Sequence, residues 1–402
     1  MATADFAADG AVPVAGGGSG QLAVRRLTLT DFRCYRHQRL EADGVPVVLT
    51  GPNGAGKTNL LEGLSFLVPG RGLRRARLAD ITRRPAVGQP QTSPRPWGVA
   101  ALISAGGGEV EIGTGFEAGT DGGRDKRIVR IDGETQRSQA ALAEHVGCQW
   151  LTPQMDRLFL EGPPARRRFL DRLVFGSDPT HAARVNAYDH AMRERTRLLS
   201  AGRADTDWLK ALESAMAAQG TAVAAARLEI AGRLSARLAE TRGAFPSAAI
   251  HVAGTVEAWL GEAPALEAEE RFQDALAHRR GQDAAEGRAT LGPHLSDLAV
   301  RHLGNGRAAE MCSTGEQKAL LVALVLASAR MRAYELGVAP LLLLDEIAAH
   351  LDETRRMALF DEIQVLDAQV WLTGTDAALF RPLAGRAQFF TVADAKVTPT
   401  RA

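Results

Sequence analysis

The chain has 402 residues, 48 of them basic and 47 acidic, so its formal net charge is +1. This length suits roughly two or three domains, and the hydrophobic fraction of 45% excludes wholesale disorder. A net charge near zero excludes a nucleic-acid binder that works through bulk positive charge, so any such binding needs a local patch. The basic residues are mostly arginine, with lysine only at Lys57, Lys126, Lys210, Lys318 and Lys396.

The start of the chain, residues 1–20, lacks the basic segment of a signal peptide and contains a glycine-rich run, so we expect a flexible tail. The three cysteines are scattered, and their spacing fits neither a disulfide framework nor a zinc site. The longest apolar run, 319–329, is too short to span a bilayer. We therefore expect a soluble, cytoplasmic protein.

Short apolar segments bounded by glycine or proline predict strands in the first 150 residues. We expect these strands at 22–29, 36–41, 47–50, 99–104, 109–113 and 127–131. A glycine-rich loop and a helix over 57–67 follow the third strand. The last three strands are separated by glycine clusters, which indicates an antiparallel β subdomain.

The composition changes near residue 150, and no proline occurs between His181 and Phe245. Helical periodicity predicts helices over 181–200, 207–242 and 265–280, which together form a helical lobe. Mixed structure returns after residue 290, with a helix from 315 to about 335. The expected strands there are 298–302, 340–344, 370–373 and 389–392. The chain thus divides into a tail (1–20), a first α/β part (21–150), a helical lobe (151–285) and a second α/β part (286–402).

One glycine-rich loop matches the phosphate-binding pattern G-x-x-x-x-G-K-[ST] between an apolar strand and a helix. It consists of Gly51, Pro52, Asn53, Gly54, Ala55, Gly56, Lys57 and Thr58. Backbone N–H groups of such a loop surround phosphate oxygens, the lysine reaches the β- and γ-phosphates, and the threonine hydroxyl binds Mg²⁺. A chance glycine-rich turn is the alternative, which the flanking strand and helix disfavour.

An apolar strand that ends in two acids, Asp345 and Glu346, supplies the second half of such a site. Asp345 is expected to hold Mg²⁺, and Glu346 to orient or deprotonate the attacking water. Alone, an apolar run that ends in acids is more often a plain strand terminus, but the phosphate loop reverses that preference. Because the two motifs are far apart in sequence, the helical lobe is inserted between them.

The segment before this strand, 313–318, opens a helix with Ser313 and Gly315 at its N-terminus. Hydroxyl and amide donors at a helix N-terminus can bind a phosphate. The alternative is that Ser313 is only a helix cap, with Glu316 completing a capping box.

The order of these motifs resembles an ABC-type ATPase head and, more narrowly, the RecF family of bacterial recombination-mediator ATPases, which are related to SMC heads. The resemblance covers nearly all of the chain after the tail. It is carried by residues 29–35, 51–59, 71–77, 162–171, 292–294, 313–318 and 341–352. It implies an α/β fold, an ABC-type P-loop ATPase head with an inserted helical lobe.

The resemblance also implies an ATP sandwich, in which two heads dimerise face to face. Each head would then act in cis through Lys57, Thr58, Asp345 and Glu346, and in trans through Ser313, Gly315 and Lys318. Asp352 would cross the dimer interface, and Gln154 occupies about the place of a glutamine that senses Mg²⁺. ATP and Mg²⁺ are the implied cofactors.

As to function, the resemblance implies an ATP-dependent DNA-binding protein and weak ATPase of recombinational gap repair and replication-fork maintenance. Such a protein binds single-/double-strand junctions and works with RecR and RecO to load RecA. Five arginines are candidates for contact with DNA, although each could equally belong to an ordinary solvated face: Arg74, Arg75, Arg77, Arg166 and Arg167.

The sequence departs from related patterns at two places. Thr373 and Thr375 stand where transporter ATPases have a switch histidine, and Leu295 follows the Gly-Pro-His segment where RecF proteins usually have arginine. The alternatives are a transporter ATPase subunit, an SMC-like architectural protein and a nucleotide-gated scaffold with negligible turnover. The missing histidine disfavours the first, and the short helical region disfavours the second.

Overall fold

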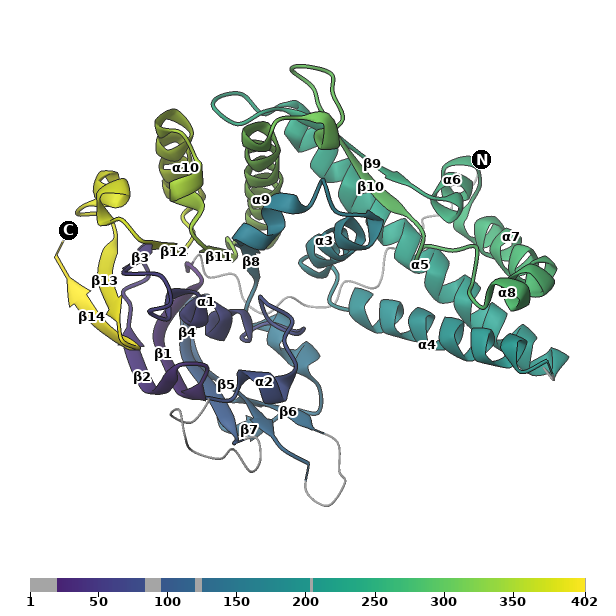
Figure 1. Ribbon diagram of the computed structural model, residues 1–402, viewed down its shortest axis with the longest axis horizontal. Coiled ribbons are helices and arrows are strands. Elements are labelled where there is room, and N and C mark those ends of the chain that lie inside the picture. Colours follow the sequence, from purple (N-terminus) through teal and green to yellow (C-terminus); the bar gives the residue numbers. More distant parts are fainter. Residues whose placement is uncertain (1–19, 84–94, 120–124, 203–204, 402) are drawn as a thin grey trace, which may run out of the picture.

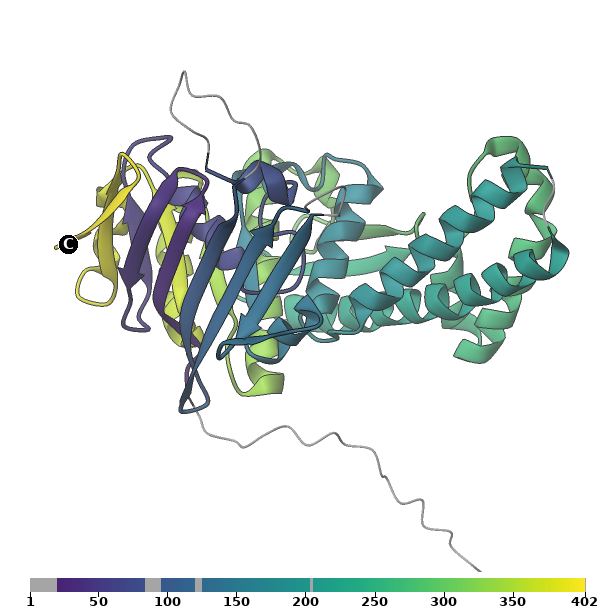
Figure 2. The ribbon, with the colours of Figure 1, turned by 90° about the horizontal axis from the view of Figure 1, so that it is seen from below.

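The computed structural model describes residues 20–83, 95–119, 125–202 and 205–401, so nearly all of the expected N-terminal tail lies outside it. Its strands form a six-stranded mixed sheet, a six-stranded antiparallel sheet and a two-stranded sheet. The two large sheets lie at one end of the molecule, and a helical lobe extends away from them (Figures 1 and 2). Within the described ranges, no helix is both long and apolar enough to cross a membrane.

The mixed sheet is the structural centre of the head, and its order is β14-β13-β3-β12-β11-β8. All neighbours are parallel except the β13–β14 pair. Its strands are β3 (Val47–Thr50), β8 (Cys148–Leu151), β11 (Leu341–Leu344), β12 (Val370–Gly374), β13 (Gln388–Ala393) and β14 (Lys396–Thr400). The central strands β3, β11 and β12 are buried at every residue, as expected where a parallel sheet is covered on both faces.

The antiparallel sheet covers one face of the mixed sheet, with α1 (Lys57–Ser65) between them. Its strands are β1 (Ala23–Phe32), β2 (Tyr35–Glu41), β4 (Trp97–Ala105), β5 (Gly108–Glu117), β6 (Lys126–Ile131) and β7 (Glu134–Thr135). Leu29 of β1, Leu60 of α1 and Leu343 of β11 belong to one hydrophobic core. The predicted antiparallel subdomain is therefore confirmed.

Two helices, α9 (Thr314–Leu336) and α10 (Glu353–Leu366), cover the opposite face. Because side chains alternate along a strand, Leu342 and Leu344 point into this second core, with Leu324 of α9 and Phe360 of α10. Burial on both faces explains why the leucine run of β11 has no polar alternation.

In the part of the helical lobe that the structure describes, there are six helices and the two-stranded sheet. They are α3 (Pro163–Phe175), α4 (His181–Ser200), α5 (Thr206–Ala239), α6 (Thr255–Glu262), α7 (Ala265–His278), α8 (Arg280–Glu286), β9 (Ala248–Ala253) and β10 (Asp297–His302). Helices α4 and α5 form a hairpin, and α7 and α8 pack near its outer end (Figure 1). The fully buried Arg195 joins α4 to its neighbours, since it pairs with Glu213 at 3.0 Å and Asp283 at 2.6 Å.

Short helical turns connect these elements: α2 (Leu78–Ile81), η1 (Gln139–Glu144), η2 (Pro153–Arg157), η3 (Ala309–Met311), η4 (Ile347–His350) and η5 (Ala377–Leu383). Two strand pairings cross the expected divisions of the chain. Strand β8 continues past residue 150 into the head sheet, and β9 pairs with β10 across residue 285. The third predicted lobe helix also divides, because α7 ends at His278 and α8 begins at Arg280.

Candidate functional site

The phosphate-binding loop lies between β3 and α1, and two of its glycines are required by their surroundings. Gly51 has φ 151°, and a Cβ there would lie 2.0 Å from the carbonyl oxygen of Val392. Gly56 has φ 116°, and a Cβ there would lie 2.6 Å from the hydroxyl of Tyr35. That hydroxyl donates to the Gly56 carbonyl at 3.1 Å, so Tyr35 supports the loop from below.

Lys57 occupies the centre of this loop and is only 3% exposed. Its ammonium donates to the carbonyl oxygens of Gly51 at 2.7 Å and Pro52 at 2.9 Å. Burial lowers the pKa of Lys57, while the charges of Glu346 and Asp345 act in the opposite direction. The lysine and the two acids, distant in sequence, therefore share one electrostatic environment.

Asp345 lies at the carboxyl end of β11, directly opposite the start of α1. Its Oδ1 accepts hydrogen bonds from the hydroxyls of Thr58 at 2.9 Å and Thr373 at 2.7 Å. Burial raises the pKa of Asp345, and these hydroxyl bonds partly offset that effect. The structure thus brings together Thr58 and Asp345, the two oxygen donors that the sequence assigned to Mg²⁺.

Glu346 follows with a left-handed backbone (φ 54°), which is uncommon for a residue other than glycine. Its N–H donates to the Thr373 hydroxyl at 2.9 Å, so one threonine contacts both consecutive acids. Thr375, in contrast, is exposed beyond the end of β12. The role of Thr373 comes from the β12–β11 pairing, which sequence reasoning did not supply.

The N-terminus of α9 is exposed at Ser313 and Gly315. The capping box is present, because the Glu316 N–H donates to Ser313 Oγ at 3.3 Å and the Ser313 N–H donates to Glu316 Oε2 at 2.8 Å. Lys318 is engaged within the chain, with its ammonium 2.9 Å from Asp156 Oδ2 in η2.

The remaining two predicted site residues, Asp352 and Gln154, are exposed. Asp352 caps α10, where its Oδ1 accepts from the Arg355 N–H at 2.9 Å. Gln154 lies in η2, which follows β8. Strand β8 runs parallel to β11, and the Asp345 N–H donates to the Leu151 carbonyl at 2.9 Å. The turn η2 therefore begins beside Asp345, at the carboxyl ends of these two strands.

The five candidate DNA-contact arginines are in different environments. Arg74 donates to Glu62 at 2.8 Å. Arg166 is only 8% exposed and donates two hydrogen bonds to Asp297, each 2.7 Å long. Those charges are already neutralised, which argues against Arg74 and Arg166 as DNA contacts. Arg167 donates to a backbone carbonyl, whereas Arg75 and Arg77 are exposed.

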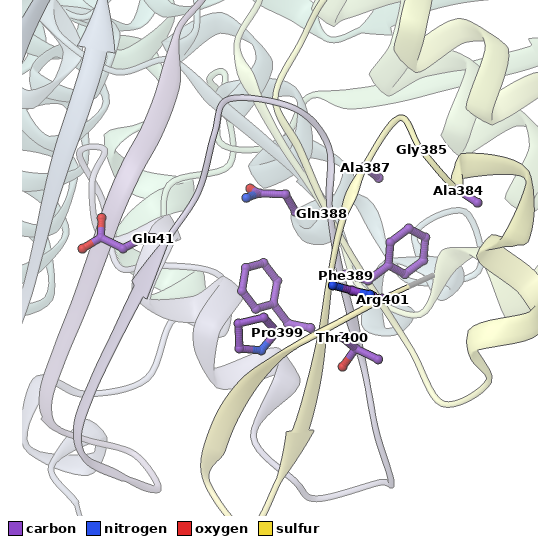
Figure 3. A pocket seen from close by; sticks show the side chains of 10 residues that line it. Glu41, Ala384, Gly385, Ala387, Gln388, Phe389, Pro399, Thr400 and Arg401 are labelled. Carbon is purple, nitrogen blue, oxygen red and sulfur yellow. The ribbon is translucent and has the colours of Figure 1, made fainter.

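A cavity of about 550 Å³ lies elsewhere, at the side of the head near the end of the chain (Figure 3). Its walls include Glu41, Phe389, Pro399 and Arg401. Gln388, also in its wall, pairs with Val47, the first residue of β3, whereas the phosphate-binding loop follows the last residue of β3. The cavity therefore lies where the parallel strands begin, and the phosphate-binding loop lies where they end, so the cavity is not part of this site.

Comparison with known proteins agrees with this geometry. The family described as "RecF/RecN/SMC N terminal domain" matches residues 23–395. A DNA replication and repair protein RecF from Mesorhizobium japonicum is 50% identical over 384 residues, which cover 94% of this chain and 98% of the relative. The RecF of Rhizobium meliloti is 52% identical over 376 residues, or 93% and 98% of the two chains.

Solved structures show the same fold. A structure of the recombination mediator protein RecF-ATPrS in the RecFOR pathway has a TM-score of 0.80 at 20% identity, covering 94% of this chain and 98% of that one. The Smc head domain derived from Pyrococcus furiosus, solved with the C-terminal domain of ScpA, has a TM-score of 0.51 at 15% identity, with 95% and 97% covered. The predicted α/β head with an inserted lobe is confirmed.

Proposed function

Because the chain belongs to the RecF family of DNA replication and repair proteins, we propose that it is an ATP-dependent DNA-binding protein and weak ATPase of recombinational gap repair and replication-fork maintenance. The observation that carries the proposal is that four side chains lie together at the carboxyl ends of β3 and β11: Lys57, Thr58, Asp345 and Glu346. Relatives that are about half identical over nearly the whole chain support the biological context.

In the proposed site, the N–H groups of the loop and the N-terminus of α1 bind the phosphates of ATP. The Lys57 ammonium exchanges the Gly51 and Pro52 carbonyls for the β- and γ-phosphate oxygens. Since the side chain is buried and already directed into the loop, little conformational entropy is lost in this exchange.

The oxygen donors Thr58 and Asp345 fit Mg²⁺, which prefers hydroxyl and carboxylate ligands and completes its shell with water and phosphate. When bound, Mg²⁺ neutralises charge on the terminal phosphates. Glu346, next to Asp345 and partly exposed, orients the attacking water and accepts its proton.

Thr373 is a positioning residue for both acids. We expect Thr373→Val, which keeps the shape but removes the hydroxyl, to lower kcat about 10- to 100-fold with little change in KM. The reason is that the part-buried Glu346 N–H and the buried Asp345 carboxylate each lose a hydrogen-bond partner. Steady-state kinetics of ATP hydrolysis give kcat and KM separately and so measure this effect. Thr373→Ser should restore most of kcat, and a Val variant with wild-type kcat would reduce Thr373 to a packing role.

The exposed N-terminus of α9 supports an ATP-sandwich homodimer. Ser313 and Gly315 are accessible there, so a second copy could place its bound ATP against them. Lys318 is left out of these trans contacts because Asp156 holds its ammonium. ATP would shift the population from monomer to dimer, since one ligand then binds two subunits.

The proposed partners are gapped DNA at single-/double-strand junctions and RecR, with RecO and RecA later in the pathway. Support comes from the names of the relatives and from the RecFOR pathway to which the solved RecF belongs. An SMC-like architectural role would need long helical arms. The longest helix in the described part of the chain is α5, with 34 residues.

Sedimentation of the full chain with Mg-ATP, gapped duplex DNA, both or neither tests the proposal. We expect monomer alone, dimer with Mg-ATP, and co-sedimentation with DNA that depends on Mg-ATP. Phosphate release from the same samples separates a slow ATPase from a scaffold without turnover. The DNA function is contradicted if DNA neither sediments with the chain nor changes ATP-dependent dimerisation.

A further inference from the structure

One ion pair ties the turn η2 to α9, the helix whose N-terminus carries the proposed trans contacts; we call this pair the brace. The Lys318 ammonium lies 2.9 Å from Asp156 Oδ2, and each side chain is only 19% exposed. The pair of Lys210 and Asp207 on the helical lobe differs, since its atoms are 3.7 Å apart and its side chains are 65% and 91% exposed. A surface pair of that kind contributes little, whereas removal of one partner from a largely buried pair leaves the other charge without compensation.

The η2 end of the brace is anchored beside the nucleotide site. The Leu151 carbonyl, at the end of β8, accepts the Asp345 N–H at 2.9 Å, so η2 begins next to the acid that we propose binds Mg²⁺. Met155, the residue before Asp156, packs against both of the large hydrophobic cores of the head. Asp156 therefore belongs to a segment whose position is fixed by the head sheet.

The α9 end of the brace lies close to the proposed trans contacts. Lys318 follows Gly315 by three residues, so the two lie on the same side of the first turns of α9. Between them, Gln317 is 3% exposed and its Nε2 donates to the Cys312 carbonyl at 3.0 Å, which holds the segment before the helix against its first turn. A shift of α9 at Lys318 would therefore carry Ser313 and Gly315 with it.

We propose that the brace fixes the spacing between the two half-sites that one copy brings to the ATP sandwich, an inference that rests on the proposed function. One half-site is the chain's own nucleotide site at Asp345, and the other is the contact at Ser313 for the ATP of a second copy. In a symmetric dimer each copy meets the other through the same two half-sites, so both ATP molecules are enclosed only if this spacing is kept. Association is stronger when the spacing is set beforehand, because less freedom of motion is lost.

In this proposal Lys318 and Asp156 are positioning residues that do not touch the nucleotide, and one substitution separates that role from a direct contact. If Lys318 itself contacted the ATP of a second copy, Asp156→Asn would release the ammonium and strengthen the dimer. In a brace the two partners act only together, so the loss of either one weakens the dimer. The two roles therefore predict opposite signs for Asp156→Asn.

Sedimentation of the full chain over a series of protein concentrations with saturating Mg-ATP measures the dimer dissociation constant. We expect Lys318→Met and Asp156→Asn each to raise it roughly 5- to 150-fold, the usual range for coupling between two sites. The double variant should resemble either single variant, because the second substitution removes nothing more. Lys318→Arg, which keeps a cation within reach of Asp156, should restore most of the dimerisation.

Two further measurements distinguish a lost brace from a damaged head. A fluorescent ATP analogue should bind dilute, monomeric protein within about twofold of wild type in every variant, because the phosphate-binding loop keeps its contacts. Hydrolysis per subunit should recover when the protein concentration is raised above the weakened dissociation constant. Lys210→Met is the matched control and should stay within about twofold of wild type in both dimerisation and hydrolysis.

The brace is overturned if Asp156→Asn dimerises as well as the wild type or better, or if the losses of the two single variants add in the double variant. Weaker ATP binding by the monomeric variants would also contradict it, since the proposed role concerns dimerisation alone. If the wild-type chain stays monomeric at saturating Mg-ATP, the proposed sandwich fails and not only the brace, so the two failures are distinguishable.

Discussion

Lys57→Met is expected to raise the dissociation constant for ATP about 10- to 150-fold, because a charge-assisted hydrogen bond to phosphate contributes roughly 1.5–3 kcal/mol. The ammonium already donates to the Gly51 and Pro52 carbonyls, so the wild-type side chain is directed into the loop before ATP binds. The proposed ATP-dependent dimerisation and DNA retention should weaken at ATP concentrations that saturate the wild type.

Isothermal titration calorimetry with ATP measures directly how Lys57→Met changes the dissociation constant. Lys210→Met is the matched control, since Lys210 is a 65% exposed lysine on the helical lobe. The control should bind ATP as the wild type does. Unchanged nucleotide affinity in Lys57→Met would show that the loop is not the phosphate site and would remove the basis of the proposed function.

The second large effect is expected for Glu346→Gln, which keeps the size of the side chain but removes the carboxylate that we propose accepts a proton. General-base catalysis contributes roughly 10²- to 10⁴-fold, so hydrolysis should slow by about that factor. ATP affinity should change little, because Lys57, Thr58 and Asp345 remain. The proposed ATP-bound dimer should then persist, because in this proposal hydrolysis is the step that dissolves it.

Light scattering with saturating Mg-ATP, together with phosphate release, measures both parts of this result. Glu270→Gln, which changes an exposed acid on α7 of the helical lobe, is the control and should dimerise and turn over normally. A monomer at saturating ATP would count against the sandwich, and normal turnover would show that another group accepts the proton.

The parts of the site that sequence reasoning located are those with local physical causes. The glycines of the loop and the apolar strand before Asp345 are short patterns that specify their own conformation, and β3, α1 and β11 begin where expected within a residue. The helical lobe followed from composition and periodicity, and α4 has the expected bounds, His181–Ser200.

The sequence pointed to Thr373 and Thr375 at the place of a switch histidine but did not give the contacts of Thr373, because such contacts depend on partners distant in the chain. Thr373 reaches Asp345 and Glu346 only because β12 lies between β3 and β11. Whether an arginine is neutralised depends in the same way on tertiary packing: Arg166 meets Asp297 from another element, while Arg168 two residues later does not. Strand β8 is four residues long, and only its pairing with β11 identifies it.

The order of the mixed sheet has a consequence for synthesis of the protein. Strand β3 ends at residue 50, but its two neighbours, β12 and β13, come after residue 369. The phosphate-binding loop therefore leaves the ribosome more than three hundred residues before the strands that flank it. Until then β3 exposes apolar side chains and has two edges with unpaired N–H and C=O groups. A strand in this state is prone to aggregation. A chain cut short before β12 would keep every residue of the loop and still lack the sheet that shapes it.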